Sequence, residues 1–100
     1  MRVEDLLKRA RELWPGKMTD QEVAIAMGVV YGEICRYVRD RSEGRKVDDA
    51  EIKKELGNML FSTIRWCDDM GLAPEECIKL AVEAQEKYVR KKLGAKTFSR

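Results

Sequence analysis

The sequence predicts an all-α protein, a single domain over residues 1–100 that forms a helical bundle of about four helices. Apolar residues recur at intervals of three and four throughout, and no segment sustains an alternation of apolar and polar residues. The only two prolines, Pro15 and Pro74, fall where this periodicity breaks. Packed helices around one shallow core are therefore the expected architecture for a chain of this length.

The first two helices are expected over residues 3–14 and 19–41. Pro15 and Gly16 end the first. The second opens with a capping box, in which Glu22 follows Thr19 by three residues. Its apolar stripe comprises Val23, Met27, Val30, Ile34, Tyr37 and Val38.

The second helix carries no charged residue between positions 23 and 32 on any of its faces. A helix that is uncharged all round is usually buried all round. A chain of 100 residues has too few other elements to surround it. We therefore expect the chain to complete its core by pairing with copies of itself, as a homodimer or tetramer.

The third and fourth helices are expected over residues 48–70 and 73–94. A capping pattern from Asp48 to Glu51 starts the third, and Gly71 stops it. Pro74 suits the first turn of the fourth helix. Its packed side is expected to comprise Ile78, Ala81, Val82, Gln85, Val89 and Leu93. The tail, residues 95–100, is expected to fray unless Phe98 docks.

Composition narrows the range of functions. The net charge of +2 gives no global field that would demand nucleic acid, and no apolar run approaches the roughly 20 residues of a bilayer-spanning helix. The chain has no histidine, which excludes Ser-His and Cys-His nucleophilic machinery. Its three cysteines are best explained as reduced, mostly buried thiols of a cytoplasmic protein.

Oxygen-bearing side chains follow one edge of each long central helix. On the third helix these are Glu51, Glu55, Asn58, Ser62 and Asp69, and on the second helix Glu33 and Asp40 occupy a similar edge. If the two helices pack antiparallel, Glu33, Glu55 and Asn58 share a groove. Carboxylate and amide oxygens suit Mg²⁺, which often uses few protein ligands and keeps sites for water and phosphate.

Several segments together resemble one family. Residues 51–61, EIKKELGNMLF, are similar to the Glu-Leu-Gly-Asp-hydrophobic-Leu signature of the MazG-like all-α nucleoside triphosphate pyrophosphohydrolases. Residues 66–78, WCDDMGLAPEECI, resemble the helix junction of that family, and Gly32-Glu33-Ile34 resembles its Gly-Glu-Leu segment. The resemblance covers roughly residues 23–90. It implies a bundle completed by dimerisation that uses Mg²⁺ to cleave nucleoside triphosphates to monophosphate and pyrophosphate.

The resemblance also implies site residues, by position. Glu55 matches the first acid of the family's Glu-x-x-Asp pattern, where Asn58 replaces the aspartate, and Glu33 matches the last acid of Glu-Glu-x-x-Glu, where Val29 and Val30 replace the other two. Glu33 and Glu55 would be the catalytic carboxylates and, with Asn58, the metal ligands. Basic residues of the last helix would receive phosphates: Lys79, Lys87 and Arg90.

Plainer explanations of these residues stay open. Glu33 and Glu55 can be solvated residues beside an apolar stripe, and Asn58 an ordinary surface amide. The basic residues can be solvated helix faces paired with nearby acids. Tyr31 and Trp66 can stack on a base or simply pack. The alternative function is a non-catalytic oligomeric bundle that kept the fold and lost the metal site; nucleic-acid binding rests only on the basic clusters and is disfavoured.

Overall fold

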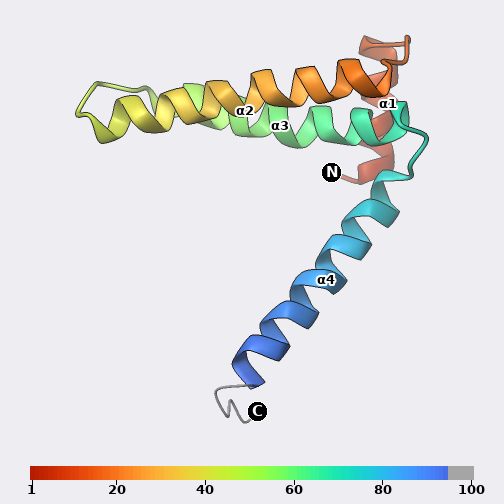
Figure 1. Ribbon diagram of the computed structural model, residues 1–100. Helices are drawn as coiled ribbons and strands as arrows, with labels where there is room; N and C mark the ends of the chain where they lie inside the picture. The colour runs from red at the N-terminus through yellow and green to blue at the C-terminus, as the bar shows by residue number, and fades with distance from the viewer. Residues whose placement is uncertain (95–100) are drawn as a thin grey trace.

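Four α-helices joined by short connections make up the computed structural model, which describes residues 1–94 (Figure 1). They are α1 (Val3–Leu13), α2 (Asp20–Ser42), α3 (Asp49–Asp69) and α4 (Pro74–Gly94). No strand occurs in this range, so the predicted all-α class is confirmed. The expectation for Phe98 and the tail concerns residues outside the described part of the chain.

Side chains at the helix starts explain where α2 and α3 begin. The hydroxyl of Thr19 accepts a hydrogen bond from the Glu22 amide at 3.2 Å, and the Glu22 carboxylate accepts one from the Thr19 amide at 2.9 Å. The predicted capping box is therefore present. At α3 the carboxylate of Asp48 accepts from the amide of Ala50 at 3.0 Å, so Asp48 caps the helix without a reciprocal bond from Glu51.

Helices α2 and α3 lie side by side as an antiparallel hairpin, and α1 packs against the carboxyl-terminal part of α3 (Figure 1). The turn between the two long helices contains Gly44, whose φ of 78° lies in the left-handed region. Helix α3 contacts each of the other three helices. It is therefore the element against which the rest of the chain is arranged.

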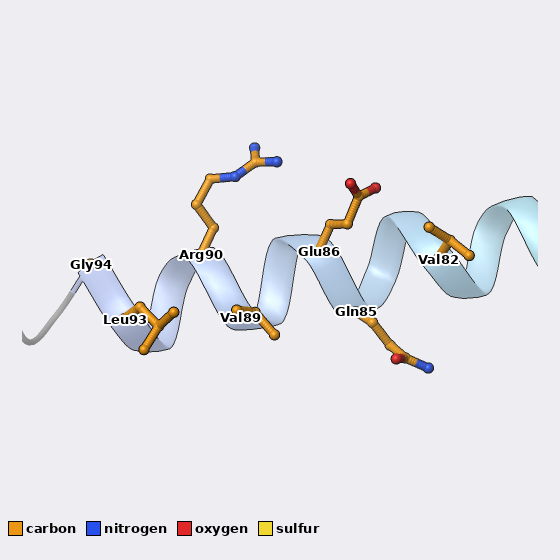
Figure 2. A pocket seen from close by; sticks show the side chains of 7 residues that line it. All are labelled: Val82, Gln85, Glu86, Val89, Arg90, Leu93 and Gly94. Carbon is orange, nitrogen blue, oxygen red and sulfur yellow. The ribbon is translucent and has the colours of Figure 1, made fainter. Parts of the chain in front are cut away.

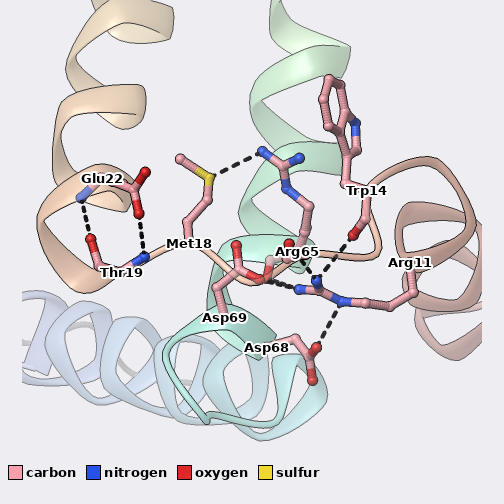
Figure 3. Close-up of polar contacts among 9 residues, drawn as sticks. Arg11, Trp14, Met18, Thr19, Glu22, Arg65, Asp68 and Asp69 are labelled. Carbon is pink, nitrogen blue, oxygen red and sulfur yellow. Dashed lines mark hydrogen bonds and ion pairs between the residues drawn. The ribbon is translucent and has the colours of Figure 1, made fainter.

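A polar cluster fixes α1 on α3 (Figure 3). The Arg11 guanidinium forms ion pairs with Asp68, at 2.9 Å, and with Asp69, whose side chain is fully buried. The same guanidinium donates to the Arg65 carbonyl oxygen at 3.2 Å and to the Trp14 carbonyl oxygen at 3.2 Å. One arginine therefore joins the end of α1, the following loop and the end of α3.

Helix α4 departs from the hairpin (Figure 1). The chain turns at Gly71, with a φ of 76°, and α4 then contacts α3 near this turn. Beyond Cys77 every residue of α4 through Lys92 is exposed. The stripe expected to be the packed side of this helix, including Val82 and Val89, therefore has no cover within the described chain.

The described chain is open and its core is small. Its radius of gyration is 17.2 Å, whereas a compact domain of 100 residues has about 13 Å. The buried apolar residues in the described range are Ala10, Val23, Trp66 and Pro74. The expectation of mostly buried thiols is wrong for Cys35, which is exposed, while Cys67 and Cys77 are half-buried. In the described range, no helix has both the length and the apolar character needed to cross a bilayer.

Candidate functional site

The hairpin places Glu33 level with Glu55. The Tyr37 hydroxyl of α2 donates to the Glu51 carboxylate of α3 at 3.5 Å, a contact that indicates the register of the two helices. In an antiparallel pair, each step back along one helix is matched by a step forward along the other. Glu33 lies four residues before Tyr37 and Glu55 four residues after Glu51. Both glutamates are half-buried, as the seam between two helices requires.

The carboxylate of Glu33 already has a cationic neighbour. Arg36, one turn further along α2, donates from Nη2 to Glu33 Oε2 at 2.8 Å. This hydrogen bond and the charge of Glu33 raise the pKa of the Arg36 guanidinium above its ordinary value. Arg36 also lies over the ring of Tyr37, 5.0 Å from its centroid. The cation that pairs with Glu33 therefore comes from the same helix, α2.

Asn58 lies one turn beyond Glu55 on α3, exposed to solvent. Its Oδ1 accepts a hydrogen bond from the Ser62 hydroxyl at 2.9 Å. A carbonyl oxygen has two lone pairs, so this bond leaves one position for a cation. Two carboxylates and one amide oxygen form a small donor set of hard oxygens, of the kind that Mg²⁺ accepts when water and phosphate complete its shell.

The site lacks a third carboxylate. Within residues 1–94, no three side chains of the histidine, cysteine, aspartate or glutamate types come together in a way that could hold a metal ion. Asp69, which shares an edge of α3 with Glu55 in the sequence pattern, is instead bound to Arg11 at the far end of the helix. A cation held by Glu33 and Glu55 would therefore face about two carboxylate charges. The family pattern that the sequence resembles would supply four.

Lys79, Lys87 and Arg90 lie on α4 and are exposed. Because α4 leaves the hairpin, the single chain does not bring them to Glu33 and Glu55 (Figure 1). Figure 2 shows Arg90 and Leu93 projecting from opposite sides of α4. Lys79 shares a shallow surface depression with Glu75, Glu76 and Glu83, an acidic setting that disfavours phosphate.

The basic cluster near the hairpin turn is largely neutralised by its neighbours. Arg45 pairs with Asp40 at 2.8 Å and Arg41 with Asp49 at 2.5 Å, while Arg39 lies 3.9 Å from Glu43. These contacts match the plainer explanation of the cluster as solvated helix faces. They leave little unpaired positive charge there for a nucleic-acid backbone.

Sequence reasoning missed an apolar groove between α2 and α3. Seven residues line it: Met27, Gly28, Val30, Tyr31, Met59, Thr63 and Trp66. Trp66 is 2% exposed, which agrees with packing rather than base stacking, whereas Tyr31 is 64% exposed at the groove rim. The signal available in the sequence was the uncharged stretch of the second helix, which indicated missing cover but not its place.

The geometry of these residues is the main guide to function, because comparisons with protein-family models, curated proteins and solved structures found no match to this chain.

Proposed function

We propose that the protein is a MazG-like nucleotide-binding protein that holds a nucleoside triphosphate with Mg²⁺ beside Glu33 and Glu55. One observation supports this proposal: the contact between Tyr37 and Glu51 indicates a register in which Glu33 and Glu55 would lie level on the two adjacent helices. The resemblance of residues 51–61 and 66–78 supports it. With three free cysteines, the protein suits a reducing compartment, and we propose the cytoplasm.

The roles follow from the donor set. Glu33 and Glu55, assisted by Asn58, would hold Mg²⁺, which when bound neutralises phosphate charge and lowers the pKa of water. In the hydrolytic reaction, the oxygen of water bonds to the α-phosphorus and the bond to the bridging oxygen breaks. The products are nucleoside monophosphate and pyrophosphate. With half the family's carboxylates, this chain would bind Mg²⁺ weakly, and we propose weak or lost turnover.

Phosphate contacts are the second requirement. Arg36 is already beside Glu33 and presents a guanidinium of the kind that grips phosphate oxygens. Lys87 and Arg90 would serve the same site only from a second copy, because α4 leaves its own hairpin. Lys79 would contribute least, given its acidic neighbours.

The test measures two quantities separately. The first is Mg²⁺-dependent binding of a panel of nucleoside triphosphates, and the second is pyrophosphate release from each. Loss of a group that merely supports a ligand costs about 10- to 100-fold in metal affinity, so Glu55→Gln should weaken Mg²⁺-dependent binding by at least about tenfold. The matched control is Glu12→Gln, an exposed glutamate of α1 far from the hairpin seam. Equal nucleotide binding with and without Mg²⁺, or in wild type and Glu55→Gln, would refute the site.

A second candidate function is a non-catalytic assembly protein that kept the bundle and lost the ligands. The observation that favours it is Val29 and Val30 at family ligand positions, with Val30 half-buried against α3. It predicts that Val30→Glu lowers the stability of the assembly while Glu55→Ala changes little. A large loss of nucleotide affinity in Glu55→Ala would exclude it.

A further inference from the structure

The turn between α3 and α4 brings two cysteines to the same joint. Cys67 lies near the end of α3, and Cys77 lies in the first turn of α4. Within residues 74–92 of α4, only Pro74 and Cys77 are not exposed. The place where α4 is covered by the rest of the described chain is therefore also the place where the two cysteines lie.

The backbone of the turn fixes the positions of both cysteines. The Leu72 amide donates to the Cys67 carbonyl oxygen at 2.8 Å, which is the long hydrogen bond of a Schellman motif at the end of α3. The Cys77 amide donates to the Ala73 carbonyl oxygen at 3.1 Å, at the start of α4. Because Leu72 and Ala73 are consecutive, two hydrogen bonds and one peptide link connect the backbones of the two cysteines.

The side chains of the two cysteines also interact. Both are half-buried, and both are free thiols. Burial, followed by a hydrogen bond to the Cys77 thiol, raises the pKa of the Cys67 thiol to about 11. Neighbouring thiols at a short, fixed turn are the arrangement from which a disulfide forms once an oxidant removes two electrons.

The third cysteine lies too far away to compete for either thiol within one chain. Cys35 is exposed on α2, and Tyr37, two residues further along that helix, contacts Glu51 of α3. Glu51 is 16 residues before Cys67, and that length of helix spans about 24 Å. A disulfide of Cys35 therefore requires another molecule, so Cys35 serves as an internal reference for the other two.

We propose that an oxidised low-molecular-weight disulfide, of which glutathione disulfide is the usual example, converts Cys67 and Cys77 into a reversible disulfide that cross-links α4 to the end of α3. Because burial disfavours the Cys67 thiolate, the Cys77 thiolate attacks first, forms a mixed disulfide and releases one small thiol. The Cys67 sulfur then loses its proton, bonds to the Cys77 sulfur and displaces the second small thiol. Two protein thiols are oxidised and one small disulfide is reduced to two thiols.

The cross-link acts on the least supported helix of the chain. The loop that it closes runs over 11 residues, from Cys67 to Cys77. Closing a loop of that length should raise the equilibrium constant for folding by up to about 100-fold, because the unfolded chain loses conformational freedom. The reduced joint holds α4 by backbone hydrogen bonds and the packing of its first turn. The oxidised joint adds a covalent bond, so the redox state controls how firmly α4 is fixed.

The experiment treats the reduced full chain with glutathione disulfide, blocks the remaining thiols with N-ethylmaleimide and digests the product with trypsin. Cleavage after Arg65 and Lys79 places both cysteines in one peptide, residues 66–79, while Cys35 falls in residues 18–36. We expect peptide 66–79 to be two hydrogens lighter and to carry neither glutathione nor the blocking group. Further cleavage before Asp68 should leave its two halves joined until a reductant is added.

Three serine variants serve as controls. Cys35→Ser should form the same internal disulfide as the wild type, because Cys35 takes no part in it. Cys67→Ser should accumulate glutathione on Cys77, since the second step has lost its thiol. Cys77→Ser should form no internal disulfide in peptide 66–79. Circular dichroism of each reduced variant, compared with the wild type, shows that the helices are retained.

Hydrogen exchange measures the effect on the joint. In the oxidised Cys35→Ser protein, the slowest amides of residues 66–79 should exchange about tenfold more slowly than in its reduced form, whereas those of α1 should change less. Equal exchange in the two forms would overturn the proposed fixing of α4. A wild-type peptide 66–79 that carries two separate adducts, or that is linked only to Cys35, would overturn the disulfide itself. No nucleotide or Mg²⁺ is present, so these outcomes are independent of the proposed nucleotide site.

Discussion

Arg11 of α1 binds the buried carboxylate of Asp69 at the carboxyl end of α3, across 58 positions of sequence (Figure 3). The carbonyl end of a helix is an unfavourable place for an anion. The guanidinium offsets that cost, and its bonds to the Trp14 and Arg65 carbonyl oxygens hold the loop after α1 as well. This contact therefore ties the first helix and the loop after it to the end of α3.

Removing Arg11 should therefore be costly. Loss of one partner of a buried ion pair destabilises a protein by about 3 kcal/mol or more, because the remaining charge is left uncompensated. We expect Arg11→Ala to lower the free energy of unfolding by about that amount in chemical denaturation at matched protein concentration. The control is Arg9→Ala, whose exposed contact with Glu12 at 3.7 Å should be worth about 0.5 kcal/mol or less. Equal effects of the two substitutions would contradict the assignment.

The capping box at the start of α2 has a measurable effect on the pKa of the Glu22 carboxyl. The hydrogen bonds from the Thr19 amide and hydroxyl lower the pKa of Glu22 below its ordinary value of 4.5. The stabilising contribution of this carboxylate is thus fully present above the unfolded value and is lost as pH falls through the folded value. In Thr19→Ala the amide still donates, so the pKa of Glu22, followed by NMR, should rise only part of the way. A full return to 4.5 would show that the backbone bond is absent.

The thiols should differ in reactivity. Burial, followed by the interaction with Cys77, raises the pKa of the Cys67 thiol to about 11. Since the thiolate is the nucleophile, Cys67 should be alkylated slowly at neutral pH, while the exposed Cys35 reacts first. Peptide mass spectrometry after timed iodoacetamide treatment gives the order. Faster modification of Cys67 than of Cys35 in the folded protein would contradict the described packing of α3 and α4.

Substitution by alanine should change the stability of the protein in opposite directions at Gly71 and Gly57. Gly71 has a φ of 76°, a conformation that costs alanine about 1 kcal/mol, so Gly71→Ala should lower the thermal midpoint. Gly57 lies inside α3 with open space around it, so Gly57→Ala should gain about 0.5–1 kcal/mol of helix propensity. Thermal unfolding by circular dichroism measures both. A loss of stability in Gly57→Ala would instead reveal a close neighbour that the single chain does not contain.

Much of the fold could be predicted from local sequence signals. The Thr19 capping box, the glycine stop at Gly71 and the proline at the start of α4 each act within one turn of helix, so their effects do not depend on distant contacts. They place the helix ends within a residue or two of those observed. The predicted antiparallel packing of the second and third helices is observed, whereas a groove shared by Glu33, Glu55 and Asn58 stays a prediction.

Periodicity shows which face of a helix is apolar, but not which partner covers it. For this reason the stripe of α4 was expected to form a packed side, yet Val82 and Val89 are exposed in the described chain. The same limit applies to Asp69, which shares an edge with Glu55 in the helical pattern but is bound by an arginine from α1. Contacts between distant segments depend on how helices cross, and a single sequence does not encode that locally.

The short turn at Gly71 sets the direction of the long helix α4 relative to the hairpin. Helix α4 has 21 residues and extends about 30 Å from a joint of only a few residues. A rotation of about 10° at that joint displaces its far end by roughly 5 Å, without altering a single contact inside the hairpin. Substitutions in these few positions therefore change the direction of the whole of α4 relative to the hairpin. Chains that differ only there can form larger assemblies of different geometry.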